Sequence, residues 1–164
     1  MPKIRLEHVT GIAGLGICFL ALAVSAPSQS TDPQAPVAAK PVNVELLHDG
    51  DTITRGSIDL GWGRSLTIGP DGESPGIRAF GYDAWEVTRG RRTVEVTEAE
   101  ITKGLKARDE LSGLIQSGQL YAEDPGERDP YGRVSAILWV KQGQRWIYLA
   151  GWMEQQGHLR TPRK

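Results

Sequence analysis

The sequence predicts a small β-barrel with about two helices, an α+β fold. The 164-residue chain contains 20 glycines and 10 prolines, which indicate many turns and therefore short strands rather than a helical bundle. The expected elements follow in the order three strands, one helix, two strands and one helix. Strands that come first and are then capped by a helix are typical of a five-stranded barrel of the oligonucleotide-binding (OB) type.

The N-terminal part is expected to lie outside this barrel. Residues 1–25 have a charged start, an apolar run and the sequence Ala23-Val24-Ser25, a pattern typical of a secretory signal peptide. We therefore expect a secreted or periplasmic protein. The alternative is a membrane anchor at residues 9–24, although a membrane span needs ~20 apolar residues. Residues 26–41 are rich in Pro, Ala, Ser and Gln and predict a flexible linker, which leaves 42–164 as the folded domain.

Composition excludes several classes of protein. Lys plus Arg total 19 and Asp plus Glu total 20, so the chain is not a histone-like polyanion binder. The single cysteine, Cys18, excludes a disulfide framework and a site built from several thiolates. Removal of the signal segment with Lys3, Arg5 and Glu7 would change the net charge from −1 to about −2.

The five strands are predicted from alternating or β-branched stretches. They cover residues 42–47, 51–68, 77–82, 119–122 and 133–140. A turn is expected at His48-Asp49-Gly50, and a bend or bulge at 60–63, where two glycines interrupt the second strand. Residues 93–97 would form a further short strand.

Two helices complete the fold. Apolar side chains recur at helical spacing between residues 98 and 116, at Ile101, Leu105, Leu111, Leu114 and Ile115. Thr97 and Glu100 form a capping-box pattern at the start of this helix, and Gly118 is a natural stop. A second, short helix is predicted over 147–156, with Gly157 at its C-terminal end.

The charged residues that are candidates for catalysis or binding lie at predicted strand ends or turns. Asp51, Asp83 and Glu86 are acidic, and Arg78 and Arg133 flank them. Carboxylates bind hard cations such as Ca²⁺, whereas arginine forks bind phosphate oxygens. A carboxylate beside a bound phosphate can accept a proton from water. Together these are the parts of a phosphodiester hydrolase, although any soluble domain contains acids and arginines.

Four segments carry a family resemblance. They are Asp49-Gly50-Asp51-Thr52, residues 77–86 (IRAFGYDAWE), residues 129–133 (DPYGR) and residues 149–153 (LAGWM). In this order they resemble the staphylococcal-nuclease (thermonuclease) family, whose motifs are D-G-D-T, I-R-L-x-G-I-D-A-P-E and D-x-Y-G-R. The resemblance extends over residues 42–159. D-G-D-T alone is also a hairpin turn, but R-x₄-D-x₂-E followed by Y-G-R is specific.

The resemblance implies a five-stranded OB-fold barrel of the staphylococcal-nuclease type. It implies an exported, monomeric, Ca²⁺-dependent nuclease that hydrolyses phosphodiester bonds of single-stranded DNA or RNA with little sequence specificity. The Ca²⁺ ligands would be the side chains of Asp51 and Asp83 and the backbone carbonyl of Ala84. No obligate protein partner is implied.

The same resemblance assigns the catalytic roles. Glu86 would act as the general base on a water molecule for in-line attack at phosphorus. Arg78 and Arg133 would stabilise the charge on the phosphoryl oxygens. Asp49 would lie behind the metal ligands and order them.

The sequence departs from the family pattern near the expected site. Trp85 stands where the family has proline, which is expected to leave the loop that carries Glu86 less constrained. Arg89, Arg91 and Arg92 form a basic insertion that either contacts phosphates or is a solvated loop. The chain ends soon after the second helix, without the family's later aromatic residues, so substrate affinity is expected to be weaker.

These departures support an alternative function. The protein would be a catalytically weak or inactive envelope protein on the same fold, involved in exopolysaccharide (succinoglycan) biosynthesis or binding. Some nuclease-fold relatives are associated with that process, and the D-A-W-E variant of residues 83–86 looks similar to theirs. The slightly acidic charge of the mature chain agrees with this alternative, because counterion release requires clustered Lys and Arg.

Overall fold

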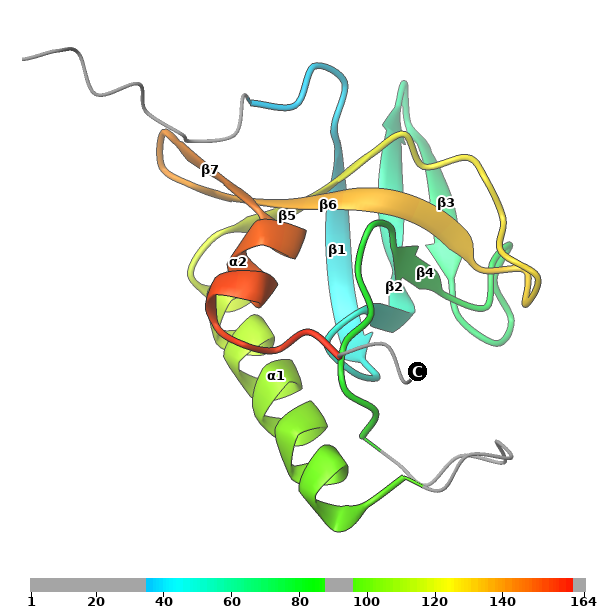
Figure 1. The fold of residues 1–164 in the computed structure, drawn as a ribbon. Helices are drawn as coiled ribbons and strands as arrows, with labels where there is room; N and C mark the ends of the chain where they lie inside the picture. The colour runs from blue at the N-terminus through cyan, green and yellow to red at the C-terminus, as the bar shows by residue number, and fades with distance from the viewer. Residues whose placement is uncertain (1–34, 88–95, 161–164) are drawn as a thin grey trace, which may run out of the picture. The chain divides into compact units, whose positions relative to one another are not determined.

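The computed structural model describes residues 35–87 and 96–160, which belong to one structural unit, Asp32–Lys164 (Figure 1). Its elements in chain order are β1 (Lys40–Leu47), β2 (Thr52–Gly61), β3 (Arg64–Ile68), β4 (Ile77–Ala79), α1 (Glu98–Gln116), β5 (Gln119–Glu123), β6 (Val134–Gln142), β7 (Arg145–Tyr148) and α2 (Leu149–Gln155). The expected signal segment, most of the expected linker and the basic insertion lie outside the described residues. In the part of the chain that is described, no helix has the length and apolar character needed to cross a membrane.

Five strands close into a mixed barrel, which confirms the predicted OB-like fold. β1 pairs antiparallel with both β2 and β5, β5 pairs with β6, and β2 pairs with β4. A parallel pairing of β4 with β6 completes the ring. β3 and β7 extend it as antiparallel neighbours of β2 and β6, respectively. Closure pairs the edges that an open sheet would leave exposed.

The glycine-rich segment 60–63 forms a hairpin turn, so the prediction of one bent strand over 51–68 was wrong. Gly61 lies opposite Arg64 in the β2–β3 ladder, which leaves Trp62 and Gly63 as the two turn residues. Their φ angles are 57° and 71°, as a type I′ turn requires. An irregularity in register between Asp59 and Gly61 lies beside the turn.

Other boundaries also differ from the prediction. The second helix begins at Leu149 rather than at residue 147, because residues 145–148 form β7 and pair with β6. β4 ends at Ala79 rather than at residue 82, and β1 begins at Lys40. Of the short strand predicted at 93–97, residues 93–95 lie outside the described part, and Val96 and Thr97 are not in a strand.

Helix α1 has the predicted bounds and the predicted cap. The Glu100 N–H donates to the Thr97 side chain, and the Thr97 N–H donates to the Glu100 carboxylate at 2.8 Å. This reciprocal pair satisfies two backbone donors at the helix start. The helix buries Ala107 and Leu111 against the barrel, whereas Leu105, expected on the apolar face, is exposed.

The hydrophobic core fills the barrel and continues under both helices. Strand residues such as Ile58, Ile77 and Val140 are fully buried. The same cluster includes Leu111 of α1 and Met153 of α2. Both helices lie on the same side of the barrel in Figure 1.

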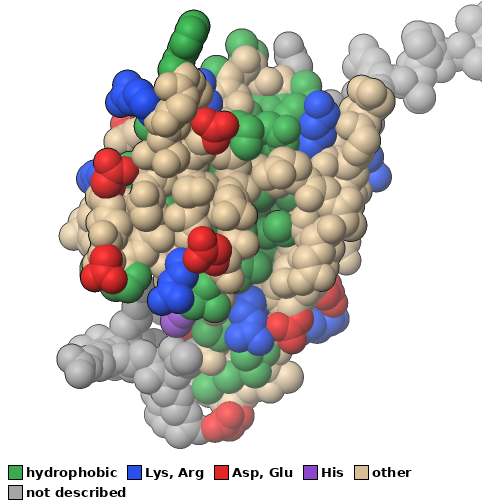
Figure 2. Space-filling model, turned by 180° about the vertical axis from the view of Figure 1, so that it is seen from behind, with side chains coloured by type: hydrophobic (Ala, Val, Ile, Leu, Met, Phe, Trp, Pro, Cys, Tyr) green, Lys and Arg blue, Asp and Glu red, His purple; other side chains and the backbone are tan. Residues whose placement is uncertain are grey.

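Surface charge is mixed on the face that Figure 2 shows. Lys and Arg side chains lie interspersed with Asp and Glu side chains, and no large patch of one sign covers the described part of that face. Attraction of a charged ligand must therefore come from a local arrangement of side chains rather than from this surface as a whole.

A buried histidine joins the C-terminal segment to α1. Gly157 ends α2 with a φ of 72°, and His158, which follows it, is only 3% exposed. The Nε2 atom of His158 lies 2.6 Å from a carboxylate oxygen of Glu110. Lys106 also contacts Glu110, with its Nζ at 3.6 Å from the other carboxylate oxygen.

We predict that Glu110 makes folding stability depend on pH. The hydrogen bond with His158, together with the nearby charges of His158 and Lys106, lowers the pKa of Glu110 from its ordinary value of 4.5. Since a lowered pKa favours the ionised form in the folded state, this stabilisation is present above the ordinary pKa and is lost as pH falls through the lowered one. Thermal unfolding between neutral pH and about pH 3 should show a smaller loss of Tm for Glu110→Gln than for the wild type. Identical pH dependences would contradict the prediction.

Candidate functional site

One pocket gathers all six residues that the sequence assigned to catalysis or metal binding. Its volume is about 470 Å³. Its lining residues come from the start of β2, from β4 and the loop after it, from the loop before β6 and from the segment after α2. They are Asp51, Arg78, Asp83, Ala84, Glu86, Asp129, Pro130, Tyr131, Arg133 and Arg160.

Asp51 is a buried carboxylate at the base of this pocket, with 4% of its surface exposed. One of its oxygens accepts hydrogen bonds from the Thr52 hydroxyl at 2.9 Å and from Arg78, and the other accepts from the Ala84 N–H at 2.6 Å. Burial and the neighbouring Asp49 carboxylate raise the pKa of Asp51 to about 7, while Arg78 and the Ala84 N–H oppose that shift. A nearby cation therefore favours the ionised form of Asp51.

Each residue of the D-G-D-T segment has a structural role. A carboxylate oxygen of Asp49 accepts from the Asp51 N–H at 3.1 Å, so Asp49 orders the backbone behind the site. A Cβ at Gly50 would lie 2.8 Å from the Ala84 Cβ, so only glycine fits this approach. Thr52 donates to Asp51 and accepts from Arg133 at 3.2 Å, which links the two halves of the site.

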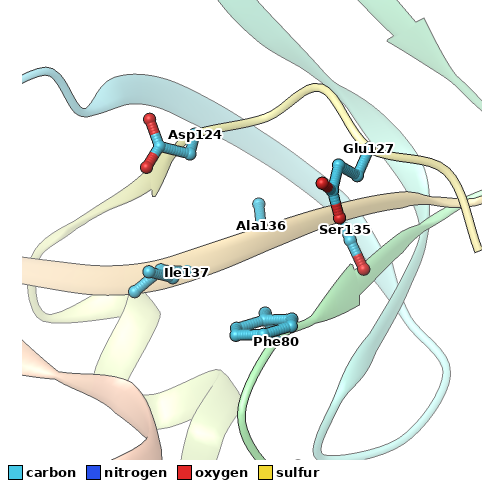
Figure 3. Close-up of a pocket in the computed structure, with 6 residues that line it drawn as sticks. All are labelled: Phe80, Asp124, Glu127, Ser135, Ala136 and Ile137. Atoms are coloured by element: carbon cyan, nitrogen blue, oxygen red, sulfur yellow. The ribbon is translucent and has the colours of Figure 1, made fainter.

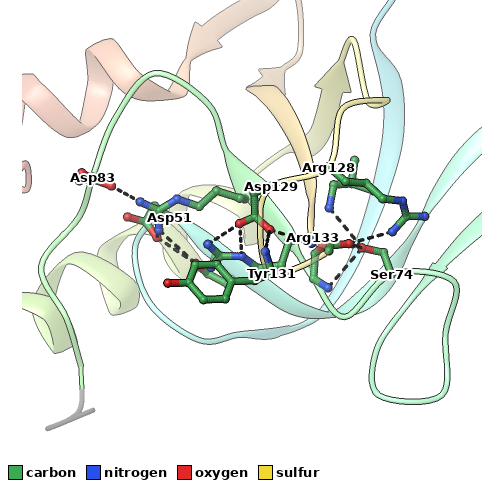
Figure 4. A network of polar contacts seen from close by, with 12 residues as sticks. Asp51, Ser74, Asp83, Arg128, Asp129, Tyr131 and Arg133 are labelled. Atoms are coloured by element: carbon green, nitrogen blue, oxygen red, sulfur yellow. Dashed lines mark hydrogen bonds and ion pairs between the residues drawn. The ribbon is translucent and has the colours of Figure 1, made fainter. Parts of the chain in front are cut away.

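Arg78 lies between the two carboxylates that the resemblance assigned to Ca²⁺. Its Nη1 binds Asp51 and its Nη2 binds Asp83 (Figure 4). Asp51 and Asp83 thus face one positive group although they lie on different segments. Two convergent carboxylates have the donor chemistry that Ca²⁺ takes. Within residues 35–87 and 96–160, no group of three or more His, Cys, Asp or Glu side chains is placed to hold a metal ion.

Asp129 fixes the loop that presents Arg133, and the sequence analysis did not single it out. One of its oxygens accepts from the N–H groups of Tyr131 and Arg133, both at 2.9 Å, and the other accepts from the Arg133 Nε at 2.7 Å (Figure 4). Partial burial raises the pKa of Asp129, but the hydrogen bonds from Arg133 and Tyr131 outweigh it and lower the pKa below its ordinary value. The sequence feature that indicates this role of Asp129 is its position four residues before Arg133 in the D-P-Y-G-R motif.

Arg160 brings a third guanidinium into the pocket. Its Nη1 lies 3.8 Å from a Glu86 carboxylate oxygen, and its backbone N–H donates to the Asp83 carbonyl at 2.9 Å. A β-bridge between Leu159 and Ala84 holds the two segments side by side. In the sequence, Arg160 is one of several Lys and Arg residues that could contact phosphate if they faced the site, and the fold brings it to residues more than 70 positions earlier.

Helix α1 supports the loop that carries Glu86. A Cβ at Gly104 would lie 2.3 Å from the Glu86 carbonyl oxygen and 2.7 Å from that of Trp85. The Lys103 ammonium lies over the Trp85 ring, 4.6 Å from its centroid. The loop that has Trp85 where the thermonuclease motif has proline is therefore constrained by packing against α1.

Comparison with known proteins adds no family assignment, since no protein-family model and no curated protein matches the chain. The candidate site is therefore defined by its motifs and by the geometry described above.

We predict that Gly104→Ala destabilises the fold, whereas Gly113→Ala on the same helix does not. The methyl group at Gly104 meets backbone oxygens, and overpacking of this kind costs about 1–3 kcal/mol. A Cβ at Gly113 meets nothing within 4 Å, and alanine in a helix interior gains roughly 0.5–1 kcal/mol over glycine. Urea unfolding of both variants measures the difference. Equal free energies of unfolding for the two variants would show that α1 is not closely packed against the loop that carries Glu86.

Proposed function

We propose that the protein is a Ca²⁺-dependent phosphodiester hydrolase that cleaves single-stranded DNA or RNA as a monomer. The observation that carries this proposal is the convergence of Asp51, Asp83, Glu86, Arg78 and Arg133 in one pocket. These residues come from three separate motifs, and the thermonuclease resemblance gives each of them a role in the same reaction.

In this proposal Arg78 and Arg133 bind the phosphate. Both side chains are about one-fifth exposed, so they reach the pocket, while Asp51 and Asp129 hold one group of each guanidinium. Arg133 is held by Asp129 and Thr52, which orients its guanidinium before a ligand arrives. A guanidinium binds two phosphate oxygens through parallel hydrogen bonds, and its charge stabilises the transition state.

Glu86 is the proposed general base. Its carboxylate lines the same pocket and is partly exposed, so water can reach it. Glu86 would take a proton from that water as the water oxygen bonds to phosphorus and the opposite ester oxygen departs. Arg160 lies beside Glu86 and orients its carboxylate.

The charge balance of the pocket favours a bound cation. Four carboxylates (Asp51, Asp83, Glu86 and Asp129) face three guanidiniums (Arg78, Arg133 and Arg160), a net charge of −1 when all are ionised. Asp51, Asp83 and the Ala84 carbonyl would hold Ca²⁺, which would change this balance to +1 and polarise a phosphate oxygen. Arg78 binds the same two carboxylates, so their use as metal ligands would release its guanidinium for phosphate.

We predict that Glu86→Gln lowers the rate of cleavage by about 100-fold or more, the typical contribution of a general base. The full chain is incubated with single-stranded DNA and with RNA, in Ca²⁺ and in EDTA. Glu154→Gln on α2 is the matched control, because Glu154 is exposed and does not line the pocket. Its activity should equal that of the wild type, and EDTA should abolish cleavage.

Two results would overturn the proposal. One is a wild-type protein that is folded by circular dichroism and leaves both substrates intact in Ca²⁺. The other is a Glu86→Gln variant as active as the wild type. The first result would direct attention to the exopolysaccharide hypothesis.

A further inference from the structure

Two hollows extend the site pocket along β4 and β6. The first, of about 360 Å³, shares Arg78 and Asp83 with the site pocket and adds Phe80 and Ser135. The second, of about 350 Å³, shares Phe80 and Ser135 with the first and reaches Glu127. Each hollow therefore shares lining residues with the next, and we call the two hollows beyond the site pocket the Phe80 groove. Each hollow is large enough for a small organic group.

Phe80 is an exposed aromatic side chain in the middle of this groove. Its backbone N–H donates to the Ala136 carbonyl at 2.8 Å, which anchors the residue beside β6. Its surface is nevertheless 58% exposed, so the ring is not part of the core. An aromatic ring held in place by its backbone, with an open face, is a ready platform for stacking a flat ligand.

The far end of the groove is acidic. Figure 3 shows the Phe80 ring on one side of the second hollow and the Glu127 carboxylate on the other, near Ser135. The Glu127 carbonyl accepts from the Ser135 N–H at 2.7 Å, so the loop that carries Glu127 is tied to β6. Asp124 adds a second carboxylate, and the six residues that line this hollow include no Lys or Arg.

These charges distinguish between parts of a nucleotide. A phosphate would be repelled by the two carboxylates, whereas a group with N–H donors would be attracted. Carboxylates accept hydrogen bonds from the exocyclic amino group of cytosine, and adenine also carries such a group. In thymine and uracil a carbonyl oxygen takes the place of that amino group, and a carboxylate accepts no hydrogen bond from a carbonyl oxygen.

From the lining residues that the three hollows share, the exposed ring and the acidic end, we infer that the Phe80 groove binds a base of the single-stranded substrate. The base stacks on Phe80, and Glu127 favours cytosine or adenine over thymine or uracil at that position. This inference rests on the proposed nuclease function and adds one base preference to it.

The test compares oligo-dC with oligo-dT, which differ at the base edge that Glu127 would read. Cleavage by the full chain in Ca²⁺ gives KM and kcat, and fluorescence anisotropy on the Glu86→Gln background gives Kd without cleavage. Phe80→Ala should raise KM and Kd for both oligomers by about tenfold, and Phe80→Trp should restore them. Glu127→Gln should remove the preference for oligo-dC. Trp62→Ala is the matched control, because Trp62 is a fully exposed aromatic residue that lines none of the three hollows.

The outcomes separate this inference from the proposed function. Cleavage by the wild type with unchanged KM and Kd in Phe80→Ala would overturn the inference and leave the nuclease function standing. An equal preference for both oligomers in the wild type would overturn the role of Glu127. A folded wild type that cleaves neither oligomer and also leaves RNA intact would overturn the proposed function itself. Saccharide binding that Phe80→Ala abolishes and oligo-dC does not compete would overturn the choice of a nucleic acid as the occupant.

Discussion

The burial of the Asp51 carboxylate is the constraint on which the site depends. A buried carboxylate is costly unless it is paired and hydrogen-bonded, and a neighbouring Asp49 adds to the cost. Asp51 meets this requirement with partners from separate segments: the Arg78 guanidinium of β4 and the N–H of Ala84. Its backbone carbonyl also accepts from the Ala79 N–H at 2.8 Å. The contacts that satisfy Asp51 therefore also hold β4 and the loop after it beside the start of β2, where the pocket forms.

A second constraint acts from the helical side of the molecule. The loop from Asp83 to Glu86 has no regular secondary structure of its own beyond a single bridge, so its position is set by what packs on it. Gly104 lets α1 approach the loop backbone on one side, and the segment around Leu159 pairs with it on the other. His158 in turn binds Glu110 of α1, so the two supports are joined to each other. A change in helix packing would therefore be transmitted to Glu86 although the helix lines no part of the pocket.

The sequence predicted the features that depend on local chemistry or on short motifs. The bounds and cap of α1 follow from Thr97, Glu100 and the helical period, and the five strands of the barrel follow from alternation. The β2–β3 turn was missed because Trp62 adopts a positive φ that side chains with a Cβ rarely take, and the glycines alone suggested a bulge. β7 was missed because a four-residue strand is too short to show a period and precedes a helix directly. The sequence marks Arg160 only as one of several Lys and Arg residues that could face the site, since its place in the pocket depends on pairing between segments distant along the chain.

The charges along the groove indicate how the molecule could recognise a polyanion without a basic surface. Lys and Arg are nearly balanced by Asp and Glu over the chain, and the face in Figure 2 is mixed in sign. General attraction to phosphate is therefore weak, and affinity has to come from a few placed contacts. The site pocket holds three guanidiniums beside four carboxylates, whereas the hollow that reaches Glu127 is lined by two carboxylates and by no Lys or Arg, with the Phe80 ring between the two. In the proposed complex, a strand bound along this direction would place a phosphate near Arg78 and Arg133 and a base near Glu127. The reverse placement would bring a phosphate to the hollow that has no guanidinium, so the arginines of the site pocket would select one orientation.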